Sequence, residues 1–261
     1  MTRVTSPSRT VALAGRQVNR IGLGTNRLTD SPEHRSFLEA AVEDGLNFID
    51  TAHVYTSGES ERTIGAALAP FGDGLVVATK GGYRGGGTEE LRAQLEQSFE
   101  RLGVETIALY YLHRVDPDVP LEETMGVLKE YRDTGRVEHI GLSQVSVAQI
   151  QRARDVVPVA AVQNEYNLGE RRYDDVVDYC TAEGIAFVPF YPLRDEGSPA
   201  LAQVAERHDA TPNQIRLAWL LHRSPAVAPI PGTLSLDHLR ENLAALDVEL
   251  SEEDLGALDA G

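Results

Sequence analysis

The sequence contains a single cysteine, Cys180, so no disulfide can form within the chain. We therefore expect a reducing, cytoplasmic location, since disulfides accumulate in oxidising compartments. Positive charge is also scarce: 24 lysines and arginines stand against 40 aspartates and glutamates, which gives a net charge of −16. An acidic surface repels phosphate backbones and anionic lipid. We expect neither a nucleic-acid partner nor a membrane partner.

Long apolar runs are missing as well. No stretch approaches the length of a membrane span. The first residues have no apolar segment like that of a signal peptide, and 1–9 are expected to form a loose tail. No proline- or glycine-rich linker divides the chain, so we expect 1–261 to be a single domain, a size that barrels often reach.

Short apolar runs alternate with helical segments. A small hairpin is predicted over 10–14 and 17–21. Helix starts are indicated at Ser31, Thr88, Ser146, Thr211 and Ser251. Strands are predicted at 21–25, 47–50, 75–79, 107–112, 139–142, 160–164, 185–191 and 227–230. This rhythm predicts an α/β fold, a (β/α)8 TIM barrel with a short N-terminal β-hairpin.

Polar residues end most of these strands: Asp50, Lys80, His113, Ser143, Gln163 and Tyr191. Each of them alone fits a structural role, such as a cap or a solvated loop residue. Together they indicate a site, because active sites of such barrels form at the carboxyl ends of the strands. The second, third and fourth strands are neighbours, so Asp50, Lys80 and His113 are expected to meet, with Tyr55 in the loop after Asp50.

These four residues have a common chemistry. A phenol loses its proton near pH 10, and a lysine ammonium nearby lowers that pKa, so Lys80 should acidify Tyr55. The Asp50 carboxylate keeps the lysine charged, and His113 can donate a hydrogen bond to a carbonyl oxygen. The set suits proton delivery to an oxygen that gains negative charge. No side chain supplies hydride, so a cofactor is required.

Several short motifs follow one another along the chain: Gly22-Leu23-Gly24-Thr25, 50–55, Thr79-Lys80, Leu112-His113-Arg114, Gly141-Leu142-Ser143, 163–167 and Ile230-Pro231-Gly232-Thr233. In these motifs and their order the chain resembles the aldo-keto reductase family over nearly its whole length. Within that family, 162–167 and 188–193 are most similar to bacterial pyridoxal reductases.

The resemblance implies an NADPH-dependent oxidoreductase that reduces an aldehyde or ketone to the alcohol by hydride transfer. Tyr55 would donate the proton, Lys80 and Asp50 would tune it, and His113 would orient the carbonyl. The implied cofactor-binding residues are Gly24, Thr25, Asp50, Ser143, Gln144, Gln163, Tyr191, Leu193, Arg194, Pro231, Gly232, Thr233, His238 and Asn242, and Asn164 is a further candidate. No metal is implied.

Two departures from the family pattern concern the cofactor. Gln144 stands where many members have asparagine. Gly232 and His238 stand where many NADP-preferring members have a lysine and an arginine. NADPH (NADP+) is therefore expected to be preferred by a smaller margin, with NADH as a second cofactor.

Two alternatives remain open at this point. Lys80 at a strand end also suits a Schiff-base lyase, and a nucleotide-binding accessory or sensor protein with little turnover would share the same fold. The expected partner is a small-molecule carbonyl substrate such as pyridoxal or methylglyoxal, and the expected state is a monomer or weak homo-oligomer. Trp219 is expected to serve helix packing.

Overall fold

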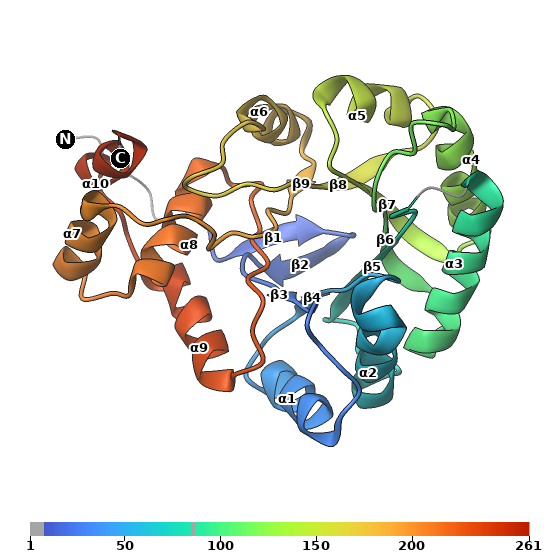
Figure 1. Cartoon of the computed structure of the whole chain (residues 1–261), viewed down its shortest axis with the longest axis horizontal. Helices are drawn as coiled ribbons and strands as arrows, with labels where there is room; N and C mark the ends of the chain where they lie inside the picture. The colour runs from blue at the N-terminus through green and yellow to red at the C-terminus, as the bar shows by residue number, and fades with distance from the viewer. Residues whose placement is uncertain (1–7, 85–86, 261) are drawn as a thin grey trace.

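The computed structural model describes residues 8–84 and 87–260, so 1–7 of the predicted tail lie outside the described residues. The described residues form a seven-stranded parallel sheet whose strand order is the order of the chain. Its strands are β3 (Leu23–Gly24), β4 (Phe48–Asp50), β5 (Val76–Gly81), β6 (Ile107–Leu112), β7 (Val137–Ser143), β8 (Val159–Gln163) and β9 (Ala186–Phe187). The sheet curls into a ring (Figure 1). The predicted strand–helix alternation is confirmed.

Helices surround the sheet (Figure 1). They are α1 (Pro32–Glu43), α2 (Glu59–Leu68), α3 (Gly87–Leu102), α4 (Leu121–Asp133), α5 (Val147–Arg154), α6 (Asp174–Glu183), α7 (Pro199–Arg207), α8 (Pro212–Arg223), α9 (Leu236–Ala244) and α10 (Glu252–Ala260), with short 3-10 turns η1 (Tyr55–Gly58) and η2 (Ala245–Asp247). Predicted capping residues bind as expected: Ser31, Ser146 and Thr211 each accept a backbone N–H of the first turn. Thr88 was wrongly placed as a cap, because α3 already includes it.

The eighth predicted strand, 227–230, is not a regular strand. Pro229 and Pro231 have no backbone N–H, so this segment cannot complete a ladder. It nevertheless closes the ring by backbone hydrogen bonds on both sides. Ala228 N donates to the Phe187 carbonyl over 2.8 Å, and Phe187 N donates to the carbonyl of Ala226, just before the segment, over 2.9 Å. On the other side, Gly22 N donates to the Pro229 carbonyl over 3.0 Å. The predicted barrel is therefore present, with one irregular member.

The predicted hairpin is confirmed as β1 (Thr10–Leu13) and β2 (Arg16–Asn19), which pair antiparallel. Its apolar side chains are buried in one cluster with Phe48 and Val76, the first residues of β4 and β5. The hairpin therefore covers the amino ends of the strands (Figure 1). The opposite, carboxyl ends are left to form the site.

Arg20 connects the hairpin end of the barrel to α8, and it has no carboxylate partner among the described residues. Its Nε donates to the carbonyl of Val227 (2.9 Å), and its Nη2 donates to those of Leu221 (2.8 Å) and Ser224. The side chain is fully buried, and this burial lowers the pKa of Arg20 to about 10. Three carbonyls near the end of α8 and in the closing segment are satisfied in this way.

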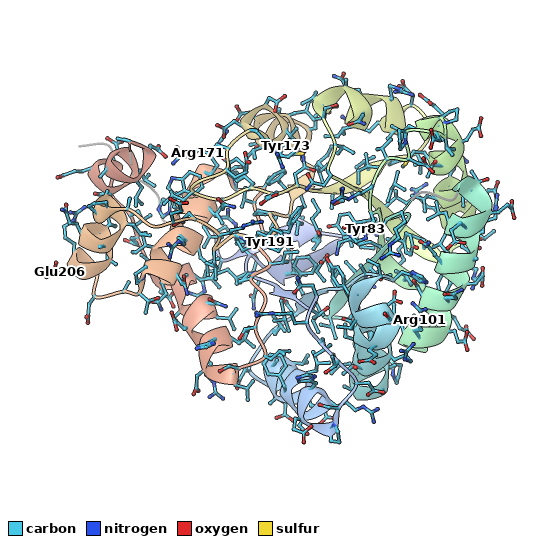
Figure 2. The ribbon with its side chains drawn as sticks, viewed as in Figure 1. Tyr83, Arg101, Arg171, Tyr173, Tyr191 and Glu206 are labelled. Carbon is cyan, nitrogen blue, oxygen red and sulfur yellow. The ribbon has the colours of Figure 1, made fainter. Side chains whose placement is uncertain are left out.

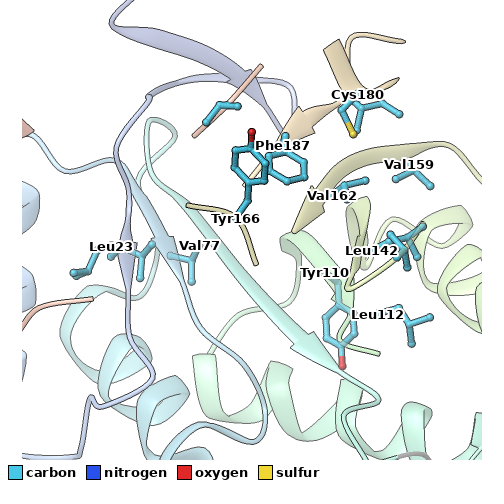
Figure 3. Packing of buried hydrophobic residues seen from close by; sticks show 14 of the residues in the cluster. Leu23, Val77, Tyr110, Leu112, Leu142, Val159, Val162, Tyr166, Cys180 and Phe187 are labelled. Atoms are coloured by element: carbon cyan, nitrogen blue, oxygen red, sulfur yellow. The ribbon is translucent and has the colours of Figure 1, made fainter. Parts of the chain in front are cut away.

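The largest apolar cluster lies between the sheet and the helices. Figure 3 shows part of it, including Leu112, Leu142 and Phe187 from different strands. A second cluster fills the inside of the ring, where the Tyr111 ring occupies the space beside Gly141. A side chain on Gly141 would place its Cβ 2.3 Å from that ring. The barrel interior is thus filled by packed side chains.

Candidate active site

Three charged or titratable residues lie together at the carboxyl edge of the sheet. Asp50 is the last residue of β4, Lys80 is the penultimate residue of β5, and His113 directly follows β6. The parallel pairing of β4 with β5 and of β5 with β6 brings these ends side by side. All three side chains are buried. The structure thus brings together the residues that the strand ends predicted.

Asp50 and Lys80 form a buried ion pair. Lys80 Nζ donates to Asp50 Oδ1 over 2.5 Å and to the Thr51 carbonyl over 2.7 Å. Burial raises the pKa of Asp50, and Lys80 opposes that rise. Burial also opposes the lysine charge, but Asp50 and Tyr55 together outweigh it and raise the pKa of Lys80. Because the pKa of Lys80 is raised, we assign its ammonium as charged at neutral pH, with Asp50 as its carboxylate partner.

Tyr55 opens the 3-10 turn η1 next to this pair. Lys80 Nζ donates to its Oη over 3.3 Å and lies 4.8 Å from the centre of its ring. Burial nevertheless raises the pKa of Tyr55, and Lys80 offsets only part of that rise. The expectation of an acidified phenol was therefore wrong in direction. The phenol stays protonated at neutral pH, with the ammonium beside the oxygen that would receive charge.

His113 faces Tyr55 edge-on, with ring centroids 6.0 Å apart. Burial, together with the charges of Lys80 and Arg114, lowers the pKa of His113 to about 2. The imidazole is therefore neutral and can donate from one nitrogen only. Its Nδ1 is buried and has no hydrogen-bond partner among the described residues.

The turn that carries Tyr55 has an uncommon backbone. Thr56 and Ser57 have φ of 46° and 56°, in the left-handed region that residues with side chains seldom adopt. Such conformations cost about 1–3 kcal/mol each and persist only when the surroundings fix them. Here Thr56 Oγ1 donates to the Leu28 carbonyl over 2.7 Å and accepts from Ser60 N over 3.1 Å.

A buried carboxylate lies behind the same turn. Glu61 is fully buried in α2 and accepts from Thr79 Oγ1 over 2.6 Å and from Arg101 Nη1 over 3.2 Å. Thr79 precedes Lys80 in β5, and Arg101 lies in α3 (Figure 2). Glu61 therefore joins the strand that carries Lys80 to the helix behind the Tyr55 turn.

A cavity of about 790 Å³ opens above Tyr55 and His113. The predicted site residues that line it are Gly24, Thr25, Asp50, Tyr55, His113, Ser143, Gln144, Gln163, Tyr191, Leu193, Arg194, Pro231 and Gly232. Lys80 lies beneath its floor. The cavity therefore gathers most of the residues that the sequence assigned to catalysis and to cofactor binding.

One side of the cavity offers a flat ring and two polar groups. Tyr191 is 46% exposed and has a φ of 51°, and Asn167 Nδ2 donates to its carbonyl over 3.0 Å. Gln163 Nε2 donates to Asp50 Oδ2 over 2.8 Å, which leaves Gln163 Oε1 as an acceptor. Ser143 is the last residue of β7, and it lines the cavity together with Gln163.

Two neighbouring amides have structural partners. Asn164 accepts from Val145 N (3.1 Å) and donates to the Val145 carbonyl (2.8 Å), so it fixes the loop after β7 and does not line the cavity. These contacts give Asn164 a backbone role, and the suggestion that it also holds a cofactor stays a prediction. Gln144, with a φ of 57°, lines the cavity and accepts from Tyr173 Oη over 3.0 Å.

Three predicted cofactor residues lie outside the cavity lining: Thr233, His238 and Asn242. Thr233 Oγ1 accepts from Ser235 N over 3.1 Å, and Ser235 Oγ in turn caps α9 by accepting from His238 N. Asn242 is buried in α9, whereas His238 is exposed. The Thr233 hydroxyl and the Ser235 hydroxyl thus each accept a backbone N–H at the start of α9.

Several lining residues were missed by the sequence analysis: Asn26, Arg27, Val54, Thr56, Tyr83, Glu165, Phe190 and Pro192. Tyr83 is the most informative of these, because its ring centroid lies 4.8 Å from that of His113. A signal was present, since Tyr83 follows the end of β5 within one loop, as Tyr55 follows β4.

Comparisons with known proteins agree on one family. The family model described as "Aldo/keto reductase family" matches residues 20–198 and 194–260. Pyridoxine 4-dehydrogenase of Escherichia coli is 37% identical over 97% of this chain and 98% of its own length. An uncharacterized oxidoreductase of Schizosaccharomyces pombe is 39% identical over 97% of this chain and 90% of its own length.

Solved structures give the same result. A thermostable aldo-keto reductase in complex with the inhibitor epalrestat has a TM-score of 0.88 and 31% identity, covering 96% of this chain and 98% of its own. An aldo-keto reductase from Klebsiella pneumoniae in complex with NADPH has a TM-score of 0.86 and 29% identity, covering 97% of this chain and 94% of its own.

Proposed function

The chain belongs to the aldo/keto reductase family, and on that premise we propose that Tyr55, Lys80, Asp50 and His113 carry out its chemistry. The protein is an oxidoreductase that reduces an aldehyde or ketone to the alcohol with NADPH. The roles of the four residues are our assignment. The observation that carries it is the 3.3 Å contact of Lys80 Nζ with Tyr55 Oη at the floor of the cavity.

The side chains that line the cavity include groups suited to binding a nicotinamide ring and its carboxamide. The exposed Tyr191 ring gives a stacking surface, and Ser143 together with Gln163 Oε1 offers hydrogen-bonding groups of the kind a carboxamide requires. These three residues would hold the nicotinamide end. When bound, NADPH supplies the hydride.

Tyr55 is assigned as the proton donor. Its hydroxyl is protonated at neutral pH because burial raises its pKa. As negative charge develops on a carbonyl oxygen at this position, the hydroxyl can pass its proton to that oxygen. The Lys80 ammonium at 3.3 Å then stabilises the phenolate that remains.

His113 and Asp50 are assigned supporting parts. The neutral imidazole of His113 can donate one hydrogen bond to the carbonyl oxygen without competing for its proton, because its pKa is lowered to about 2. Asp50 keeps Lys80 charged and holds its ammonium through the 2.5 Å contact.

The contacts of Lys80 argue against the Schiff-base lyase alternative. A Schiff-base lysine must lose its proton and reach the substrate. Lys80 is fully buried, is paired with Asp50, and has a raised pKa. No observation favours the accessory-protein alternative.

The setting of the enzyme is also a proposal. None of the described helices is both long enough and apolar enough to cross a membrane. With one buried cysteine and an acidic surface, we propose a cytoplasmic enzyme whose chain forms a single domain and acts as a monomer or weak homo-oligomer. Pyridoxal is a first substrate to test, because a relative is named pyridoxine 4-dehydrogenase.

The deciding experiment measures NADPH oxidation against a panel of carbonyl compounds that includes pyridoxal and methylglyoxal, with wild type and Tyr55→Phe. The variant keeps the ring but loses the acid, so turnover should fall by about 10²–10⁴-fold while the cofactor dissociation constant stays nearly unchanged. Turnover close to wild type in Tyr55→Phe would remove Tyr55 from this role.

A further inference from the structure

Three arginines line the cavity, and they differ in their partners. Arg194 faces Glu165, with a nitrogen–oxygen distance of 3.5 Å, and Arg27 Nη2 donates to the Gly232 carbonyl over 3.2 Å. Arg114 has no carboxylate partner among residues 8–84 and 87–260. Its one described contact is with the Tyr83 ring, whose centre lies 4.8 Å from the guanidinium carbon.

Tyr83 connects this arginine to the reacting end. Its ring is tilted against that of His113, with centroids 4.8 Å apart, and is 39% exposed. Its place is set by the residue before it: Gly82 has a φ of 78°, and its N–H donates to the buried Gln94 side chain over 2.7 Å. The backbone of the turn into Tyr83 is therefore held by this bond, and the Tyr83 ring lies between His113 and Arg114.

Arg114 is exposed at the cavity and has no carboxylate partner among the described residues. The chain carries a net charge of −16, so carboxylates are abundant, yet none neutralises Arg114 within the described residues. A guanidinium that stacks on a ring keeps its N–H groups free for a carboxylate or phosphate, to which it can donate two parallel hydrogen bonds.

The position of Arg114 separates it from the proposed cofactor side. Arg194 lies over Tyr191, 5.4 Å from its ring centre, and Arg27 contacts Gly232, both on the side of the ring where the cofactor residues lie. Arg114 lies over Tyr83 instead. Tyr83 and Tyr191 both line the cavity, and Figure 2 shows them at separate positions near the middle of the molecule.

We infer that Arg114 and Tyr83 bind an anionic group on the substrate, so that the preferred carbonyl compounds carry a carboxylate or a phosphate a few bonds from the aldehyde. This inference rests on the proposed function, because it assumes that the carbonyl lies between Tyr55 and His113. Tyr83 contributes the platform, and Arg114 contributes the charge.

The test compares aldehydes that differ only in the charged group. Succinic semialdehyde is paired with butanal, and glyceraldehyde 3-phosphate with glyceraldehyde, so that the carboxylate and phosphate arms are separate. In wild type, kcat/KM should favour the anion of at least one pair by about 10- to 100-fold, the range expected of a charge-assisted hydrogen bond. In Arg114→Gln that ratio should fall to near one.

Matched variants sharpen the comparison. Arg114→Lys keeps the charge and should retain part of the preference. Arg84→Gln removes the same charge from the Tyr83 loop, but Arg84 does not line the cavity, so the ratio should be unchanged. Tyr83→Ala should lower the ratio by removing the platform, and Tyr83→Phe should preserve it. Added salt should reduce the preference in wild type but not in Arg114→Gln.

The outcomes separate this inference from the proposed function. Equal turnover of charged and neutral partners in wild type would overturn the anionic subsite and leave the reductase assignment standing. If Arg114→Gln keeps the preference for anionic aldehydes, another part of the protein binds the anion, and this result would also overturn the inference. Failure to reduce any of these aldehydes or any other carbonyl compound would refute the proposed function, and the inference with it.

Discussion

Arg101 Nη1 donates to the backbone carbonyl of His53 over 3.0 Å, two residues before Tyr55. The same nitrogen contacts the buried Glu61 carboxylate at 3.2 Å, so one guanidinium links α3, α2 and the entry to the Tyr55 turn. Gly58 leaves room for it, because a Cβ there would lie 2.5 Å from the guanidinium carbon. Arg101 therefore acts on Tyr55 by positioning its turn.

Arg101→Met should weaken both stability and turnover. Removing one partner of a buried pair costs about 3–5 kcal/mol, because Glu61 would be left uncompensated. The free energy of unfolding is measured by urea denaturation. Turnover should fall with little change in cofactor affinity, and Arg101→Lys should restore part of it. An Arg101→Met enzyme that is destabilised but turns over normally would limit Arg101 to a structural role.

Lys80→Met should shift the alkaline limb of the pH–rate profile upward. Burial already raises the pKa of Tyr55, and Lys80 opposes that rise, so loss of the ammonium raises this pKa further. The measurement is kcat against pH in wild type and Lys80→Met, with Lys129→Met, an exposed lysine in α4, as the control. A limb that stays in place would show that Lys80 and Tyr55 are not coupled.

The Asp50–Lys80 pair should behave as a unit in stability. Lys80→Met leaves a buried carboxylate without its cation, which costs about 3–5 kcal/mol. Adding Asp50→Leu removes that charge too, and the double variant should regain much of the loss. Denaturation of both single variants and of the double variant gives the coupling energy. Additive losses would mean that the two charges stabilise the fold independently.

His113 should make the protein less stable in acid. Its pKa is about 2 in the folded state and near 6.5 in the unfolded chain, so between these values the unfolded chain binds more protons. The stabilisation is complete above pH 6.5 and is lost as the pH falls towards 2. Wild type should lose about 1 kcal/mol more per pH unit than His113→Asn between pH 6 and pH 4. Parallel denaturation curves for the two proteins would contradict the lowered pKa.

His238→Arg should increase discrimination between the two cofactors. His238 is exposed near the N-terminus of α9, and nearby Arg240 is already paired with Asp44 at 2.9 Å. A permanent cation at 238 should tighten NADPH binding several-fold through the 2′-phosphate and leave NADH binding nearly unchanged. Fluorescence titration gives both dissociation constants, with Arg240→Gln as the comparison. If the dissociation constants of NADPH and NADH fell equally, residue 238 would not lie beside the 2′-phosphate.

The barrel was predictable because its signals are local. Glycines and caps mark the helix ends, and apolar runs mark the strands, so the convergence of Asp50, Lys80 and His113 followed from strand order. The predictions for the last two strands were less accurate. The strand predicted at 185–191 is β9, which ends at Phe187, two residues before Pro189. The strand predicted at 227–230 is irregular because of Pro229 and Pro231. Helix α7 was missed although Ser198 and Pro199 carry the same start signal as Ser31 and Pro32.

Burial and distant contacts were not accessible from the sequence. The pKa of Tyr55 depends on how far water is excluded, and this outweighs the neighbouring charge that the sequence does display. The role of Asn164 depends on Val145, nineteen residues away in the chain. Tyr83 belongs to the site only because its loop folds back over His113.

The ring of strands is joined with unequal strength around its circumference. Gly22 and Gly24 donate to the carbonyls of Pro229 and Pro231 at 3.0 and 3.2 Å, and the prolines return no N–H across this seam. Gly24, Pro231 and Gly232 also line the cavity, so a cofactor held there spans both sides of the seam. A cofactor that contacts both sides of this seam would stabilise the closed ring, and by linkage the closed ring would stabilise the bound cofactor to the same extent.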